Sequence, residues 1–196
     1  MKLSEKVLLS AFVIVIIGGA FFYFRDNNGS DSNSLADSFK VGNIFGLGGN
    51  KSNIPDIGEG EPVKKEDLKE SYKAETGDFS FKYEEGMKAT SSLVEGGEMI
   101  TVEKDADHGF QVFILPFDEE GPITEERIRE DLPDIEIREP KYVEMDGNKS
   151  LAFYSSGDLG ETFEVWAVHD GKLYQIMARK NQERWTRGIL GTWEWK

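Results

Sequence analysis

Residues 161–179 read ETFEVWAVHDGKLYQIMAR, two apolar-rich runs joined by Asp170-Gly171. An Asp-Gly pair between two such runs is the strongest short signal for a β-hairpin, because the tight turn needs positive φ at both central residues. We therefore expect antiparallel strands from Glu161 to His169 and from Lys172 to Arg179. This hairpin makes antiparallel pairing the basis of the predicted fold.

The C-terminal part of the chain repeats this pattern. Two-residue turns are predicted at Gly96-Gly97 and at Asp146-Gly147, each between two apolar-patterned runs. Including these runs, the alternation predicts further strands at Phe79–Tyr83, Ser91–Glu95, Glu98–Lys104, Phe110–Phe117, Ile137–Met145, Lys149–Ser155 and Thr192–Trp195.

Two helices complete the predicted domain. Thr124 can cap a helix that runs to about Leu132, with acidic residues in its first turn. Asn181 is predicted to open a second helix, which runs to about Leu190 and ends at Gly191. The fold class is therefore α+β, a largely antiparallel sheet flanked by helices.

Three segments resemble the PsbP and Mog1-like domains over about residues 72–196. They are GDFSFKYEEGM at 77–87, VEMDGNKSLA at 143–152 and GILGTWEW at 188–195. Glu84 and Met87 stand where that superfamily usually has Pro and Trp. The resemblance implies an α/β/α sandwich and a non-enzymatic adaptor or accessory role, since members mostly bind other proteins.

The N-terminus carries a predicted membrane anchor in residues 1–25. Val7–Phe24 is almost wholly apolar, and 18 helical residues reach about 27 Å, close to the thickness of a bilayer core. Lys2 and Lys6 precede the apolar run, so we expect the N-terminus in the cytoplasm and the domain outside it. A cleaved signal peptide, with small residues at Gly18-Gly19-Ala20, is the alternative, and it also exports the domain.

A linker is predicted between the anchor and the domain, at residues 26–67, with the domain itself at 68–196. Half of residues 26–61 are Gly, Ser or Asn, which is the composition of a flexible tether. Within this linker, Phe39–Leu47 is more apolar than its surroundings, and the sequence assigns no role to it.

Net charge restricts the possible partners. The formal charge is −14, and since the first 25 residues carry three basic residues against one acidic residue, the remaining chain carries −16. Such a chain repels phosphate backbones, so nucleic acid is excluded as a partner, and a basic or neutral envelope protein is favoured. The absence of cysteine excludes thiolate metal sites and cysteine nucleophiles.

No residue set in the sequence predicts catalysis, a cofactor or a metal site. His108 lies in the turn Asp105–Gly109, which lacks the later ligands of a calcium loop, and His169 precedes a hairpin turn. The candidate partner surface is the acidic segment 118–136, of net charge −7, and in particular Glu125, Glu126, Glu130 and Asp131. A solvated helix is the alternative interpretation of these four residues.

Two functions follow as hypotheses. The first is a membrane-tethered, non-catalytic extracytoplasmic binding or accessory module of the cell envelope. The alternative is a membrane-tethered envelope hydrolase that acts on a neutral or cationic polymer. A pocket that holds His108 or His169 beside a carboxylate would favour the hydrolase.

Overall fold

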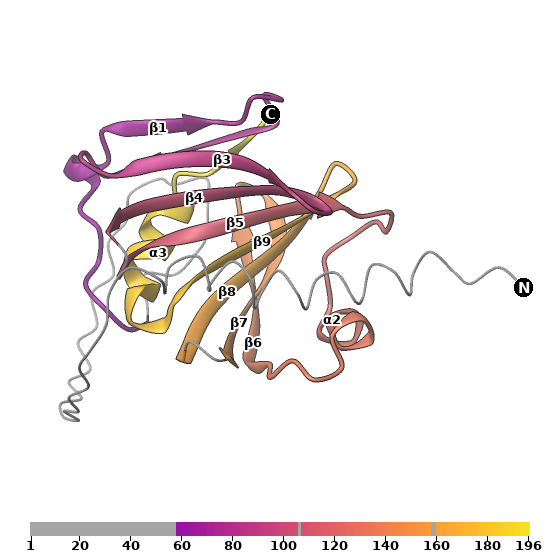
Figure 1. Ribbon diagram of the computed structural model, residues 1–196. Coiled ribbons are helices and arrows are strands. Elements are labelled where there is room, and N and C mark those ends of the chain that lie inside the picture. Colours follow the sequence, from indigo (N-terminus) through magenta and orange to yellow (C-terminus); the bar gives the residue numbers. More distant parts are fainter. Residues whose placement is uncertain (1–57, 106, 158–159) are drawn as a thin grey trace, which may run out of the picture.

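The computed structural model describes residues 58–105, 107–157 and 160–196 (Figure 1). The predicted anchor, the linker up to residue 57 and the apolar stretch Phe39–Leu47 lie outside these residues. Within the described residues, no helix has the length and apolar character needed to cross a membrane.

A seven-stranded antiparallel sheet forms the centre of the molecule, in the order β3-β4-β5-β9-β8-β7-β6. Every neighbouring pair except β5 and β9 is joined by a short connection in the chain, so β5·β9 is the long-range contact that unites the two halves. The strands are β3 (Lys88–Val94), β4 (Gly97–Asp105), β5 (His108–Pro116), β6 (Arg138–Met145), β7 (Asn148–Gly157), β8 (Gly160–His169) and β9 (Lys172–Arg179). The predicted α+β fold with a largely antiparallel sheet is confirmed.

Both Asp-Gly hairpin turns are confirmed. Asp146 and Gly147 have φ of 47° and 80°, and Asp170 and Gly171 have 47° and 70°. Positive φ at both central residues is the mark of a turn whose twist matches that of its strands.

The prediction of a Gly96-Gly97 turn is wrong by one residue. Val94 pairs with Gly97, so the turn consists of Glu95 and Gly96, and Gly96 has φ of 88°. Gly97 belongs to β4, where a Cβ atom would lie 2.0 Å from the backbone oxygen of Ile114. Both glycines are required, but only the first serves the turn.

One face of the large sheet packs against α3 (Glu183–Leu190) and a small antiparallel sheet of order β1-β2-β10. The small sheet comprises β1 (Glu70–Lys73), β2 (Phe79–Tyr83) and β10 (Glu194–Trp195), and β1 was not predicted. Trp193 stacks on Phe79 with ring centroids 4.6 Å apart and on Phe81 at 5.1 Å. These buried rings join the two sheets into one core.

The opposite face, which we call the outer face, packs against α2 (Glu125–Asp131). Thr124 caps this helix as predicted, because its hydroxyl oxygen accepts a hydrogen bond from the Arg127 N–H at 3.1 Å. Ile128 and Leu132 lie buried against the sheet. Helices therefore flank both faces, at different ends of the sheet in Figure 1.

The predicted start of the last helix is wrong, whereas its end at Leu190 is confirmed. Asn181 lies in a short 3-10 turn, η2 (Lys180–Gln182), and α3 begins at Glu183. Gln182 occupies the cap position without a side-chain capping bond, because its amide is used elsewhere.

Residues 58–67, which we call the leading segment, run along α3 and include the 3-10 turn η1 (Lys65–Asp67). Arg184 donates its backbone N–H to the Glu59 oxygen at 3.0 Å, and Val63 packs on the core. The sequence analysis assigned these residues to the linker, because a composition rich in Gly and charge does not reveal backbone hydrogen bonds.

Candidate binding hollow

The part of the outer face that α2 leaves uncovered carries polar side chains in register. Thr101, Gln111 and Met177 lie opposite one another on β4, β5 and β9, and Glu164 on β8 continues the row. Side chains that face one another across neighbouring strands lie within contact range. The topology of the sheet thus gathers residues that are up to 76 positions apart in the sequence, from Thr101 to Met177.

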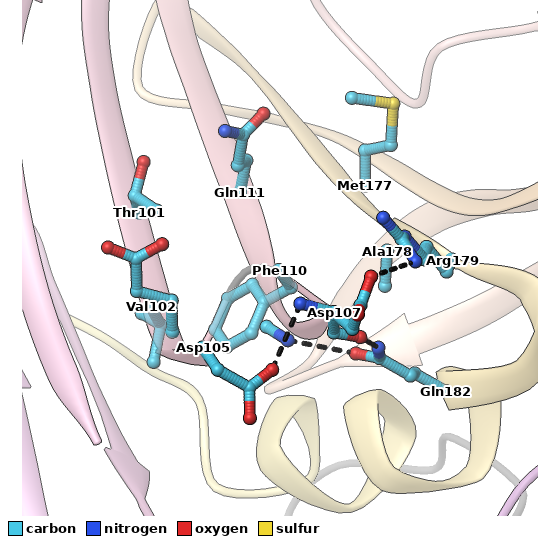
Figure 2. A pocket seen from close by; sticks show the side chains of 12 residues that line it. Thr101, Val102, Asp105, Asp107, Phe110, Gln111, Met177, Ala178, Arg179 and Gln182 are labelled. Atoms are coloured by element: carbon cyan, nitrogen blue, oxygen red, sulfur yellow. Dashed lines mark hydrogen bonds and ion pairs between the residues drawn. The ribbon is translucent and has the colours of Figure 1, made fainter. Parts of the chain in front are cut away.

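A hollow opens beside this row at Gly109. Gly109 pairs with Glu103, and a Cβ atom at Gly109 would lie 2.4 Å from the backbone oxygen of Val102, so no larger residue fits. A cavity of about 50 Å³ lies next to Gly109. It is lined by Thr101, Val102, Glu103, Asp105, Asp107, Gly109, Phe110, Gln111, Met177, Ala178, Arg179 and Gln182 (Figure 2).

Hydrogen bonds hold the rim of the hollow. Gln182 accepts from the Gly109 N–H at 3.0 Å and donates to the backbone oxygen of Asp107. Asp105 accepts from the Asp107 N–H at 2.9 Å, and Arg179 pairs with the Asp107 carboxylate at 2.7 Å. Figure 2 shows these contacts side by side at the mouth. The turn that the sequence analysis considered as a calcium loop is therefore part of this rim.

The charge on the rim favours a cationic group. Glu103, Asp105 and Asp107 supply three carboxylates, and Arg179 supplies one guanidinium, which is already paired. In the described part of the chain, no group of three or more His, Asp or Glu side chains is arranged to hold a metal ion. The geometry suits an organic cation at the mouth, next to the apolar side chain of Met177.

Glu164 is a buried carboxylate beside the hollow, and the sequence analysis did not select it. Its side chain is 3% exposed and accepts hydrogen bonds from the Thr162 hydroxyl at 3.0 Å and the Trp166 indole N–H at 2.9 Å. Burial raises the pKa of this carboxyl above its ordinary value, and these two donors and Ser155 oppose the rise. The available signal was a charge inside the apolar run from Phe163 to Val168.

The four acidic residues selected from the sequence all lie on α2. Glu125 pairs with Arg129 at 2.8 Å, and Asp131 pairs with Arg127 at 2.5 Å, each within the helix. Glu126 and Glu130 are exposed on the same helix. The structure thus separates them into two carboxylates that stabilise α2 and two that face solvent.

Neither histidine lines the hollow. His108 packs on Trp185, with ring centroids 4.6 Å apart, and its Nε2 lies 3.9 Å from Glu84. His169 stacks on Trp195 at 4.3 Å. The pairing of a histidine with a carboxylate inside a pocket, which would favour the hydrolase, is not seen at the hollow.

Comparison with known proteins returns structures only. No family model matches the sequence, and no curated protein matches it. The solution structure of cyanobacterial PsbP (CyanoP) from Synechocystis sp. PCC 6803 is similar with a TM-score of 0.46 and 12% identity, over 65% of this chain and 92% of that chain. A crystal structure from Bacteroides thetaiotaomicron is similar with a TM-score of 0.42 and 10% identity, over 66% of this chain and 49% of that one. The fold of this chain thus loosely resembles that of PsbP-like domains, as the sequence indicates. The resemblance concerns the fold alone.

Proposed function

We propose that this chain is a non-catalytic binding module of the cell envelope, tethered to a membrane by its N-terminal segment, and that it receives a basic side chain of a protein partner in the hollow at Gly109. The acidic rim of this hollow is the observation that carries the proposal. The apolar run Val7–Phe24 and the linker composition support the tethered, extracytoplasmic placement.

The size of the hollow favours a side chain over a free metabolite. Small-molecule pockets commonly enclose about 300–1,000 Å³, whereas this cavity holds about 50 Å³. That space accepts the end of a lysine or arginine side chain. Met177 would contact the methylene groups of such a side chain, and the carboxylates would contact its charged end.

The charge of the whole domain supports the same partner. The chain beyond residue 25 carries a formal charge of −16, and it attracts basic surfaces over a distance of about 8–10 Å at physiological salt. Long-range attraction speeds the encounter, and the rim carboxylates then select the group that enters.

The test uses the full chain in nanodiscs of a zwitterionic lipid, with an acetylated and amidated Gly-Lys-Gly-Lys-Gly-Lys peptide as probe. We expect Glu103→Gln with Asp105→Asn to weaken binding about tenfold, since two charge-assisted contacts are lost. The NMR signals of the backbone amides of Gly109 and Gln111 should shift when the peptide is added. The same peptide with norleucine at each lysine should not bind.

Two further variants remove the same kind of charge elsewhere. Glu66→Gln with Glu70→Gln changes exposed carboxylates far from the rim in sequence and should leave affinity nearly unchanged. Glu125→Gln with Glu126→Gln and Glu130→Gln tests the surface on α2. If only this triple variant loses binding, the partner surface is α2 and the hollow is not the site.

A further inference from the structure

A second cavity lies between the leading segment and α3, and its lining is basic. It encloses about 310 Å³, which reaches the range of small-molecule pockets. Lys65, Lys82, Arg184 and Arg187 line it, and no acidic residue does. In a chain with 37 acidic and 23 basic residues, four basic side chains around one cavity are unexpected for a solvated surface.

The leading segment creates this basic groove. At Gly188 on α3, a Cβ atom would lie 2.3 Å from Cγ1 of Val63, so glycine is needed for the segment to approach the helix. Val63 and Leu68 contribute apolar side chains to the same lining. The lining of the groove therefore combines basic and apolar side chains.

Ion pairs within the domain leave part of this positive charge available. Arg187 donates through Nε and Nη2 to Oε1 of Glu183 at 2.9 and 2.8 Å, but its buried Nη1 has no hydrogen-bond partner among the described residues. Lys65 and Lys82 form no ion pair with any residue in the described ranges. The two lysines are therefore the basic groups of the groove that are available to an anion.

Compensation of the helix dipole does not account for the arrangement. Basic side chains stabilise the C-terminal end of a helix, and Lys82 lies near that end of α3, where its N–H donates to the Thr192 hydroxyl oxygen at 2.8 Å. Arg184, however, lies in the first turn of α3, where positive charge is unfavourable. Compensation of the helix dipole can therefore account for Lys82 but not for Lys65, which lies outside the helix.

We propose that the groove binds a small organic anion, whose carboxylate or phosphate group contacts Lys65, Lys82 and Arg184 and whose apolar body lies on Val63 and Leu68. Guanidinium and ammonium groups bind both kinds of anion through charge-assisted hydrogen bonds. The proposal does not depend on the hollow at Gly109, which lies on the other face of the sheet and is acidic.

A matched series of six-carbon probes tests the site on the full chain in nanodiscs of phosphatidylcholine. Hexyl phosphate and hexanoate should bind saturably and raise the melting temperature of the domain, whereas hexan-1-ol and hexylamine should not. Inorganic phosphate should bind more weakly than hexyl phosphate, because it lacks the apolar body.

Variants assign the response to the groove. Lys65→Gln with Lys82→Gln should weaken binding of hexyl phosphate at least about tenfold. Lys88→Gln with Lys104→Gln removes the same charge from exposed strand positions outside the groove and should have little effect. A further arm uses nanodiscs that contain phosphatidylglycerol. If this lipid competes with hexyl phosphate for the wild-type chain and not for the groove variant, a lipid headgroup is the source of the anion.

Two results overturn the proposal. The first is the absence of a saturable response to every anion, in solution and in lipid. The second is a response of equal strength in the groove variant and in the control variant, because the lysines would then contribute only their net charge.

Discussion

The hydroxyl of Tyr154 on β7 donates a 2.8 Å hydrogen bond to Oε2 of Glu183, the first residue of α3. Glu183 is fully buried, and Oε2 also accepts from the backbone N–H of Glu59 at 3.2 Å, while Oε1 accepts from Arg187. One carboxylate therefore connects the large sheet, α3 and the leading segment. Burial and this hydrogen bond raise the pKa of Tyr154 well above its ordinary value near 10, so the phenol remains a donor at neutral pH.

Replacement of Tyr154 by Phe should lower the free energy of unfolding by about 1.5–3 kcal/mol, since a buried carboxylate loses a donor. Chemical denaturation measures this change. Tyr142→Phe is the control, because the Tyr142 hydroxyl makes only a 3.3 Å bond to the Ile123 oxygen on a half-exposed side chain. Equal losses in the two variants would show that Glu183 does not depend on Tyr154.

The raised pKa of Glu164 predicts that the stability of the folded chain decreases as pH rises. The folded chain holds the proton more tightly than the unfolded chain, so this stabilisation is complete below about pH 4.3 and is lost as pH rises through the raised pKa. Glu164→Gln cannot ionise and can still contact Thr162 and Trp166. The free energy of unfolding of this variant, relative to that of the wild type, should therefore increase as pH rises from 4 to 8.

Glu161→Gln gives the opposite sign and serves as the control for that pH series. Arg138 and Lys180 lower the pKa of Glu161. The free energy of unfolding of the wild type, relative to that of this variant, should therefore increase as pH rises. Parallel pH profiles of the two variants would contradict a raised pKa for the buried carboxyl of Glu164.

The leading segment should contribute to stability. A fragment of residues 68–196 lacks the Glu59 hydrogen bonds and the packing of Val63 on the core, so it should be about 2–4 kcal/mol less stable than a fragment of residues 58–196. Urea denaturation of the two fragments measures the difference. If they unfold at the same urea concentration, the domain begins near Leu68, as the sequence analysis placed it.

The membrane topology remains a prediction from the N-terminal sequence. Because Lys2 and Lys6 precede the apolar run, the domain should lie on the side opposite the cytoplasm. Protease added to intact cells or spheroplasts should then digest the domain and spare a cytoplasmic marker. Protection of the domain to the same degree as that marker would exclude the predicted orientation.

The sheet was largely predictable because its signals are local. The Asp-Gly pairs at 146–147 and 170–171 define turns by backbone conformation alone, and alternation of apolar residues defines the flanking strands. The Gly96-Gly97 turn was misplaced because both glycines are required for different reasons. Only the pairing of Gly97 with Val94, and its approach to Ile114 on β5, separates the two.

The candidate sites were not predictable, because they combine side chains whose spacing in the sequence has no fixed meaning. Glu103, Gly109 and Arg179 meet only when β9 pairs with β5, and the basic groove exists only when the leading segment packs on α3. The acidic segment at 118–136 stood out in sequence because its charges are contiguous. In the structure, two of its four selected carboxylates are committed to intrahelical ion pairs.

The sequence by itself therefore determined the antiparallel pairing, the position of α2 and the strongly acidic character of the domain, since these depend on turn conformation, hydrophobic period and composition over a few neighbouring residues. Tertiary structure alone decided that Glu164 and Glu183 are buried, that a hollow opens at Gly109 and that basic side chains gather beside Gly188. The physical reason is that burial, close approach and local electric potential are set by segments distant in the chain, and the β5·β9 pairing and the packing of α3 bring those segments together.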